Sequence, residues 1–235
     1  IETLGVERFV QVCRESVFTY KEDWEQLSRR IGYWLDYSRA YITYAPAYIE
    51  SVWWAVEQFH RRGLLYRGHK VVPYCPRCGT ALSSHEVALG YEDVTEPAVT
   101  VAFPLLDRPG EALLAWTTTP WTLPGNLALA VGPQIPYVKV RRGDVAYWVA
   151  EPLAERVFGG PVEALERRLG REMEGWRYEP PFPYLARALG PVRAWVVVAA
   201  DFVAAEEGTG IVHTAVMYGE EDYELGTRLG LPKRH

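Results

Sequence analysis

One stretch of the chain constrains its fold more than any other, namely Trp116-Thr117-Thr118-Thr119-Pro120-Trp121-Thr122-Leu123-Pro124-Gly125-Asn126. It begins where the apolar segment 113–116, which is typical of a strand, ends, and β-branched threonines suit such a strand end. The prolines and the glycine that follow force the backbone to turn. Because each threonine hydroxyl both donates and accepts hydrogen bonds, the stretch predicts a strand that opens into a rigid loop able to hold a polar ligand or a water.

The overall composition is that of a globular protein. The chain has 235 residues, of which 49% are hydrophobic and 23% charged, enough for one large domain or two modest ones. Its net charge of -5 does not indicate a nucleic-acid binder, although five basic residues cluster within 61–70. No apolar run approaches the ~20 residues of a membrane span, so no membrane partner is expected. Three cysteines do not suggest a disulfide scaffold and favour a cytoplasmic location.

Hydrophobic periodicity predicts an α+β fold, with a helical part over 1–92 and a β-rich, barrel-like domain over 93–235. Helices are expected over 5–35, with Cys13 buried on the apolar face, and over 47–62. Glycine and proline turns separate the later segments. These are expected strands at 98–103, 112–119, 128–131, 137–140, 146–149, 192–199 and 210–214, short helices over 151–158 and 162–169, a proline-rich loop at 180–183, and a last helix from Glu220.

Cys75 and Cys78 have the spacing of a zinc knuckle, with Pro76 and Gly79 suited to the tight turn between them. Structural zinc takes a full tetrahedral set of thiolate or imidazole ligands. These two cysteines supply half of it, and His85 lies off the common spacing, so we expect the other ligands outside this chain and weak binding by the chain itself. A redox-active dithiol is the alternative, but it requires a helix directly after the cysteines that residues 80–84 do not clearly supply.

A second cluster of candidate residues lies near the end of the sequence. Gly208, Thr209 and Gly210 form a turn that leads into an apolar strand ending at His213, and glycines allow a ligand to approach the backbone closely. Asp222 follows near the start of a helix. It is suited either to cap that helix, whose dipole favours a carboxylate, or to bind a cation such as an α-ammonium group.

Together these motifs closely resemble isoleucyl-tRNA synthetases, in that family's order and over essentially the whole chain. The resemblance rests on 116–126, on 208–213, on Gly219-Glu220-Glu221-Asp222-Tyr223-Glu224 and on 73–79. The related valyl and leucyl enzymes place Arg at the position of Thr119 and an acidic residue at that of Trp121. The HIGH-like and KMSKS-like motifs of the synthetic site are both missing. The resemblance therefore implies the part between them, which is the end of the first half of the nucleotide-binding domain followed by the inserted editing domain.

The resemblance implies hydrolysis of valine wrongly esterified to tRNA(Ile), without ATP-dependent synthesis by this chain. Zinc would bind at the knuckle, and ATP and Mg²⁺ would serve only the full-length enzyme, which we expect to be a monomer. The implied catalytic residues are Thr117, Thr118, Thr119, His213 and Asp222, with Asp222 binding the α-ammonium group and His213 excluding isoleucine. The implied substrate-binding residues are Trp121, Asn126, Gly208, Thr209 and Gly210, against the aminoacyl group and the terminal adenosine at the acceptor end.

One residue departs from the family pattern. The family usually has Ala-Pro in the segment after His213, whereas here Ala215 is followed by Val216. Losing proline frees φ and restores an N–H, so the loop that leads to Asp222 is expected to differ in shape.

Two other functions stay open. One is a tRNA-binding zinc-knuckle module without hydrolytic activity, and the other is the editing segment of a valyl or leucyl enzyme. A conventional hydrolase using Ser84 and His85 is disfavoured, because neighbours on a strand point to opposite faces.

Overall fold

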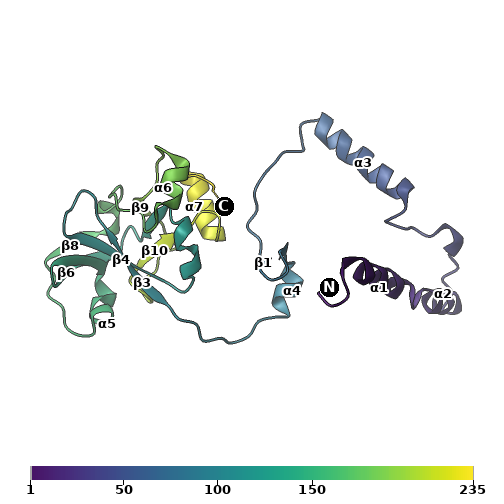
Figure 1. Ribbon diagram of the computed structural model, residues 1–235, viewed down its shortest axis with the longest axis horizontal. Helices are drawn as coiled ribbons and strands as arrows, with labels where there is room; N and C mark the ends of the chain where they lie inside the picture. Colours follow the sequence, from purple (N-terminus) through teal and green to yellow (C-terminus); the bar gives the residue numbers. More distant parts are fainter. Residues whose placement is uncertain (1, 235) are drawn as a thin grey trace. The chain divides into compact units, whose positions relative to one another are not determined.

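The computed structural model describes residues 2–234 and divides at Gly68 into two compact units. The first unit contains helix α1 (Val6–Phe18), helix α2 (Lys21–Arg30), the 3-10 helix η1 (Tyr37–Arg39) and helix α3 (Pro46–Arg61) (Figure 1). Pro46 begins α3 at a position where its missing N–H costs nothing. The long helix expected over 5–35 is therefore two helices, which separate at Thr19 and Tyr20.

The helices of the first unit are amphipathic, but none of their residues is buried. Phe9, Trp24 and Trp53 are among the large apolar side chains that remain exposed. The expectation that Cys13 is buried is wrong, since it is exposed. The periodicity correctly identifies an apolar face, but burial needs a second surface against that face, and the first unit does not supply one.

The second unit begins with a small hairpin, β1 (Tyr74–Cys75) paired antiparallel with β2 (Thr80–Ala81). Helix α4 (Ser84–Ala88) follows, and a capping box between Ser83 and Glu86 starts it. Ser84 and His85 therefore lie on a helix rather than on the strand expected for them. A hydrolase using Ser84 and His85 is still disfavoured, because consecutive residues on a helix do not face each other. The predicted domain boundary between residues 92 and 93 remains a prediction.

The rest of the second unit is an eight-stranded mixed sheet with short helices. Strand β4 (Glu111–Thr117) pairs along one edge with β3 (Val99–Pro104). On its other edge, its first half pairs with β7 (Val145–Ala150) and its end with β10 (Ile211–Thr214), both parallel to it. The sheet continues from β7 to β6 (Pro136–Arg142) and β8 (Glu166–Leu169), and from β10 to β5 (Ala128–Val131) and β9 (Val196–Ala199).

A short segment, 176–179, links two edges of the sheet, which is curled into a half-barrel. It forms β-bridges from Tyr178 to Leu105, just after β3, and from Arg177 to Val196 in β9. Backbone hydrogen bonds on both sides reinforce these bridges. The segment thereby connects two edges of the sheet around a central apolar core, in which Phe103 and Tyr178 meet edge to face with ring centroids 5.4 Å apart.

Short helices cover the outer face of the sheet (Figure 1). Helix α5 (Ala154–Phe158) packs Val157 and Phe158 against valines of β6 and β7. Leucines of α6 (Pro183–Leu189) and α7 (Glu220–Leu229) pack with β5 and β9 in a third cluster. The 3-10 helices η2 (Pro120–Gly125), η3 (Glu151–Leu153) and η4 (Gly170–Glu172) complete the unit. Within residues 2–234, none of the helices is both long and apolar enough to cross a bilayer.

Each strand expected after residue 93 is present within a few residues of its predicted bounds, as are the helix over 151–158 and the last helix. The helix expected over 162–169 is wrong, because residues 166–169 form strand β8 against β6. Lys139 of β6 holds Glu166 at 2.7 Å, a cross-strand pair that the helical spacing of the apolar residues does not reveal. The loop expected at 180–183 leads into α6, which the sequence did not predict.

Candidate active site

The two parallel strands β4 and β10 bring the predicted site residues together. Val212 of β10 lies opposite Trp116 of β4, so the carboxyl ends of both strands meet at the same edge. Thr117 is the last residue of β4, and His213 is the residue before the last one in β10. The chain then crosses to α7, which carries Asp222 on its first turn. Residues about ninety positions apart in sequence therefore share one edge of the sheet.

A cavity of about 640 Å³ opens at this edge. All five predicted catalytic residues, Thr117, Thr118, Thr119, His213 and Asp222, line this threonine cavity. Trp116, Thr122, Val212, Tyr218, Gly219, Glu220 and Glu221 complete its lining. The structure therefore brings the hydroxyl run and the imidazole and carboxylate groups to one hollow.

Hydrogen bonds among the threonines fix the shape of the wall. The backbone N–H of Thr119 donates to Oγ1 of Thr117 at 3.0 Å, and the hydroxyls of these two residues lie 3.2 Å apart. The hydroxyl of Thr122 donates to the carbonyl oxygen of Thr119 at 2.8 Å, which closes the first turn of η2. The loop is therefore held in place before any ligand arrives.

His213 is buried and both of its ring nitrogens are hydrogen-bonded. Nε2 lies 2.9 Å from Oγ1 of Thr122, and Nδ1 lies 2.9 Å from Nδ2 of Asn126. Burial lowers the pKa of His213 from 6.5 to about 4, so the imidazole is neutral at physiological pH. With both nitrogens engaged, His213 forms a fixed polar wall and is not available as a general base.

Asp222 is the partly buried carboxylate of the threonine cavity. Its Oδ2 accepts a hydrogen bond from the backbone N–H of Ala215 at 3.0 Å. The pKa of Asp222 is raised from 3.8 to about 6, mainly by burial and to a smaller extent by the nearby Glu221, while the Ala215 N–H opposes both effects. A partly desolvated carboxylate of this kind gains from a cationic ligand that replaces lost hydration.

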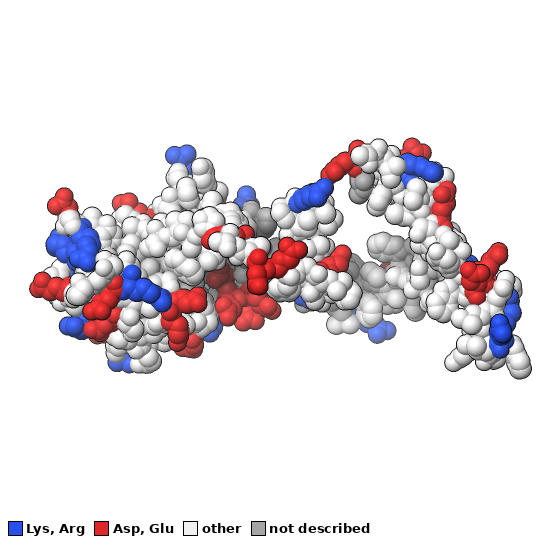
Figure 2. Space-filling view, turned by 90° about the horizontal axis from the view of Figure 1, so that it is seen from below, with Lys and Arg blue, Asp and Glu red and all other residues white. Residues whose placement is uncertain are grey.

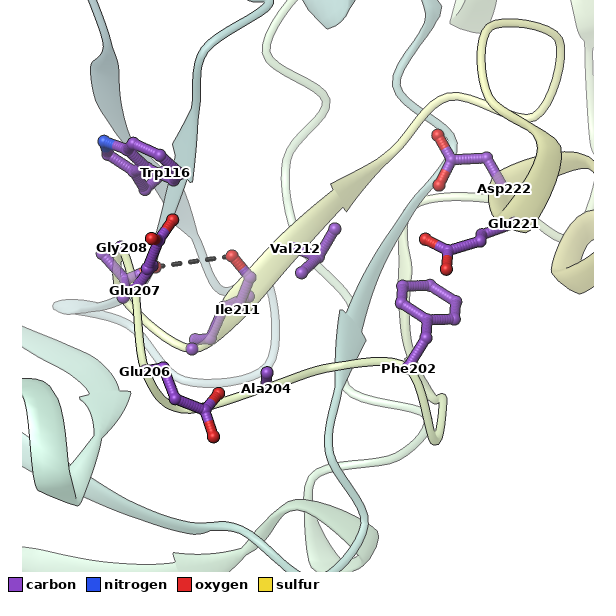
Figure 3. Close-up of a pocket in the computed structure, with 12 residues that line it drawn as sticks. Trp116, Phe202, Ala204, Glu206, Glu207, Gly208, Ile211, Val212, Glu221 and Asp222 are labelled. Carbon is purple, nitrogen blue, oxygen red and sulfur yellow. Dashed lines mark hydrogen bonds between the residues drawn. The ribbon is translucent and has the colours of Figure 1, made fainter.

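A second hollow of about 420 Å³, the glycine cavity, adjoins the first and shares Trp116, Val212, Glu221 and Asp222 with it. The predicted residues Gly208, Thr209 and Gly210 line it, as do Phe202, Glu206 and Glu207. Figure 3 shows Trp116 and Gly208 at one end and Phe202, Glu221 and Asp222 at the other, with Val212 between.

The two glycines of the predicted turn are required by geometry. Gly208 has φ 62° and Gly210 has φ 71°, a left-handed backbone that L side chains rarely adopt. A Cβ on Gly208 would lie 2.8 Å from the ring of Trp116, and one on Gly210 would lie 2.3 Å from Cβ of Ala150. The backbone of this turn therefore approaches β4 and β7 more closely than any side chain allows.

Two predicted substrate-binding residues lie away from the cavity surfaces. Trp121 is 66% exposed and lines neither cavity, so the structure does not bring it to the pocket that it was expected to wall. Asn126 is buried behind His213 and bonds to it, which makes it a support for the imidazole rather than a direct contact for a ligand.

Sequence reasoning missed three residues of this site. Thr122 was within the predicted run, but its contact with His213 was not anticipated. Trp116 lines both cavities. Tyr178 donates its hydroxyl to Oδ1 of Asn126 at 2.7 Å, and no sequence signal marks it, because it lies in the segment that bridges β3 and β9.

Cys75 ends β1, and Cys78 lies in the turn that joins β1 to β2. The backbone N–H of Cys78 donates to Sγ of Cys75 at 3.2 Å, and this bond lowers the pKa of Cys75. Favouring a thiolate fits a metal ligand. Among residues 2–234, however, no group of three or more His, Cys, Asp or Glu side chains is placed to hold a metal ion. Zinc binding through Cys75 and Cys78 stays a prediction.

Figure 2 shows acidic and basic side chains interspersed over the face drawn, with acidic side chains gathered in one place. Both cavities have acidic rims, formed by Glu206 and Glu207 in one and by Glu220 in the other, with Glu221 in both. The field at the site therefore favours a cationic group over an isolated phosphate.

Comparison with known proteins gives a consistent result. A family model described as tRNA synthetases class I (I, L, M and V) matches residues 1–204. An isoleucine–tRNA ligase from Thermus thermophilus is 50% identical over 99% of this chain and 22% of its own length. That from Clostridium tetani is 46% identical, with the same shares covered. The chain thus spans about a fifth of the length of the curated relatives it matches.

Solved structures give weaker matches. A crystal structure of GlLeuRS-CP1 has a TM-score of 0.47 and 17% identity, covering 57% of this chain and 60% of that one. The cytosolic leucyl-tRNA synthetase editing domain from P. knowlesi has a TM-score of 0.44 and 15% identity, covering 57% and 62%. Similarities at this level carry no argument about the site.

Proposed function

Because this chain belongs to the tRNA synthetases of class I (I, L, M and V), we propose that its β-rich unit hydrolyses valine wrongly esterified to tRNA(Ile). The enzyme that it serves is an isoleucine–tRNA ligase, the protein to which its relatives correspond. One observation carries the proposal, namely that the hydroxyls of 117–119, the neutral His213 and the carboxylate of Asp222 line a single cavity.

The chemical need for such a site follows from the size of the two amino acids. Valine lacks one methylene of isoleucine, and one methylene in an apolar pocket is worth only about 1–3 kcal/mol, a limit for which isoleucyl-tRNA synthetases are the standard example. A synthetic site therefore accepts valine too often. A second site that admits valine and excludes isoleucine by size corrects the error.

Asp222 is assigned to the α-ammonium group of the misattached amino acid. Its carboxylate already accepts one N–H from Ala215 and has lone pairs for a cation. The neighbouring Glu221 adds negative charge on the same rim. His213 forms the neutral wall against which the side chain packs, so a larger aliphatic group meets a ring that hydrogen bonds hold on both sides.

The hydrolytic step uses water oriented by the threonine hydroxyls. The water oxygen bonds to the ester carbonyl carbon, the bond to the ribose oxygen breaks, and a proton from the water ends on that ribose oxygen. Thr117, Thr118 and Thr119 supply donors for the water and for the developing oxyanion. His213 cannot serve as base, since both ring nitrogens are occupied. Catalysis here is therefore largely the positioning of the water against the ester.

The glycine cavity is assigned to the terminal adenosine. It adjoins the threonine cavity and shares its central residues Trp116 and Val212. Gly208, Thr209 and Gly210 present backbone to that hollow, which suits a flat base and a ribose. The acceptor end of tRNA(Ile) would then place its ester across the boundary between the two cavities.

The remaining assignments concern the longer enzyme. Cys75 and Cys78 are assigned as two ligands of a zinc ion whose other ligands lie outside this chain. ATP and Mg²⁺ belong to the synthetic reaction, for which this chain has neither signature motif. We expect the enzyme to act as a cytoplasmic monomer.

The experiment that tests this function measures deacylation of valyl-tRNA(Ile) by the 235-residue chain and by its Asp222→Ala variant. We expect the chain to release valine and the variant to lose at least tenfold in rate, because an unpaired α-ammonium costs more than about 1.4 kcal/mol. The control is Asp144→Ala, which removes an exposed carboxylate on the β6–β7 turn, outside both cavities.

A tRNA-binding module without hydrolytic activity predicts a different result. It would bind valyl-tRNA(Ile) but leave the ester intact above the background rate. Equal rates for Asp222→Ala and Asp144→Ala would reject the role assigned to Asp222.

A further inference from the structure

A buried chain of hydrogen bonds runs from the core of the barrel to the wall of the threonine cavity. The hydroxyl of Tyr178 donates to Oδ1 of Asn126 at 2.7 Å, and Nδ2 of Asn126 lies 2.9 Å from Nδ1 of His213. Nε2 of His213 in turn lies 2.9 Å from Oγ1 of Thr122. Tyr178 and Asn126 are 0% and 2% exposed, so each lost bond would leave a polar group unpaired in the core.

Asn126 determines which atom donates and which accepts in each of these hydrogen bonds. Nδ2 of Asn126 also lies 3.0 Å from the carbonyl oxygen of Ala128, which can only accept. The amide nitrogen must therefore be on the side of Ala128 and His213, with the amide oxygen facing Tyr178. One N–H goes to Ala128 and the other to Nδ1 of His213. Nδ1 is then an acceptor, and the single ring proton of the neutral imidazole resides on Nε2.

The proton on Nε2 orders the loop beyond it. Nε2–H donates to Oγ1 of Thr122, whose own proton goes to the carbonyl oxygen of Thr119 at 2.8 Å. The hydroxyl of Thr119 lies 3.4 Å from that of Thr122 and 3.2 Å from that of Thr117. In the opposite tautomer, with the proton on Nδ1, the hydroxyl of Thr122 would have to donate to Nε2. Thr122 would then lose its hydrogen bond to the carbonyl oxygen of Thr119.

The backbone around Asn126 is also clamped. Trp195 donates its indole N–H to the carbonyl oxygen of Asn126 at 3.2 Å, and its own carbonyl oxygen accepts the N–H of Tyr178 at 3.1 Å. Trp195 has φ 54°, a left-handed conformation that costs free energy for a bulky residue and persists only where the surroundings enforce it. The segment that links two edges of the sheet therefore also aligns Tyr178 with Asn126.

We propose that Tyr178 and Asn126 are positioning residues that hold His213 as the neutral Nε2–H tautomer and thereby lock Thr122 and Thr119 into the wall of the threonine cavity. Their part in hydrolysis rests on the proposed function. The tautomer itself does not, because it follows from hydrogen bonds within the protein. Neither residue needs to contact the substrate, since both act through His213.

The test is ¹⁵N nuclear magnetic resonance of the chain labelled at histidine, with His213→Gln identifying one signal among its five histidines. We expect His213 at neutral pH to show a protonated Nε2 and an unprotonated Nδ1. Asn126→Asp should place the proton on Nδ1 instead of Nε2, because a carboxylate only accepts hydrogen bonds and so favours a donor at Nδ1. Tyr178→Phe should populate the other tautomer in part, since the amide loses the bond that holds its oxygen.

The matched control is Tyr137→Phe. Tyr137 is also 0% exposed, and its hydroxyl also bonds within the barrel, to the N–H of Gly132 and the carbonyl oxygen of Gly210, but it has no bond to the chain that reaches His213. The Tyr137→Phe variant should be less stable than the wild type, but the ¹⁵N signals of its His213 should be unchanged. A wild-type Nδ1–H tautomer, or equal changes in Tyr137→Phe and Tyr178→Phe, would overturn the proposal.

Kinetics provide a second readout for the same variants. In deacylation of valyl-tRNA(Ile), Tyr178→Phe should lower kcat roughly two- to tenfold with little change in KM. An Nε2–H tautomer without any deacylation would reject the proposed function and leave the tautomer assignment standing. A KM change alone would contradict positioning through His213.

Discussion

Nε2 of His213 lies 2.9 Å from Oγ1 of Thr122, although 91 residues separate them along the chain. This contact joins the two sequence motifs of the site into one wall. The imidazole is neutral because burial lowers its pKa to about 4, and the bond to Thr122 only partly opposes that effect. The site thus combines a neutral imidazole with a carboxylate whose pKa burial raises. These opposite shifts have separate consequences.

His213 and Asp222 should change the pH dependence of stability in opposite directions. The pKa of His213 falls from 6.5 to about 4 on folding, so its contribution to stability is complete above pH 6.5 and is lost as pH falls toward 4. The pKa of Asp222 rises from 3.8 to about 6, so its contribution is complete below pH 3.8 and is lost as pH rises through 6. Each effect is at most about 3 kcal/mol.

Urea unfolding of His213→Gln and Asp222→Asn between pH 4 and 6.5 measures both effects. Relative to wild type, His213→Gln should lose less stability on acidification, and Asp222→Asn should lose more. Difference curves of the same sign would show that one of the two pKa shifts has the wrong direction.

Val216 makes Gly226 intolerant of a side chain. Val216 is buried, and a Cβ on Gly226 would lie 2.6 Å from both of its methyl groups. Replacing a helical glycine with alanine ordinarily stabilises by about 0.5–1 kcal/mol, but here overpacking should destabilise by about 1–3 kcal/mol. Thermal unfolding of Gly226→Ala checks this, and adding Val216→Ala should restore part of the loss. A stabilised single variant would contradict the close packing of α7.

Gly208→Ala should cost more stability than Gly143→Ala. The two glycines have φ of 62° and 60°, but only Gly208 faces an obstacle, the ring of Trp116 at 2.8 Å, while Gly143 has nothing within 4 Å. Gly143→Ala therefore measures the cost of the left-handed backbone alone. Denaturant midpoints of both variants give the difference, and equal midpoints would show that the turn does not press on Trp116.

The cysteine hairpin should bind zinc weakly in this chain. Two thiolates supply half of a tetrahedral set, and the described part of the chain places no third ligand beside them. Dialysis followed by metal analysis should find less than one zinc per chain, with any bound zinc removed by Cys75→Ser. Tight, stoichiometric zinc would mean that this chain completes the site itself.

The sequence was sufficient for most strands of the large sheet and for the two motifs of the site. Short apolar runs between glycine and proline turns, such as 113–116, mark a strand wherever it pairs, and the Thr run needed only its position at that strand's end. The sequence does not show which strands pair with each other. The prediction of a helix over 162–169 is therefore wrong, because residues 166–169 pair with β6 as a strand.

Long-range contacts account for the other differences. Tyr178 has no local pattern that marks it, because its importance comes from the bridge to Leu105 and from the bond to Asn126. Cys13 was expected to be buried because periodicity identifies an apolar face but not the surface that covers it. Trp121 was placed at the pocket by resemblance, while the turn of η2 leaves it exposed.

The most direct test of the central claim compares valine release from valyl-tRNA(Ile) with isoleucine release from isoleucyl-tRNA(Ile), using the 235-residue chain. If the threonine cavity is a proofreading site with a rigid His213 wall, valine should be released at least about tenfold faster, the least that one methylene provides in the usual range of about 10–200-fold. Equal rates on the two esters, or no release of valine above the uncatalysed rate, would contradict it.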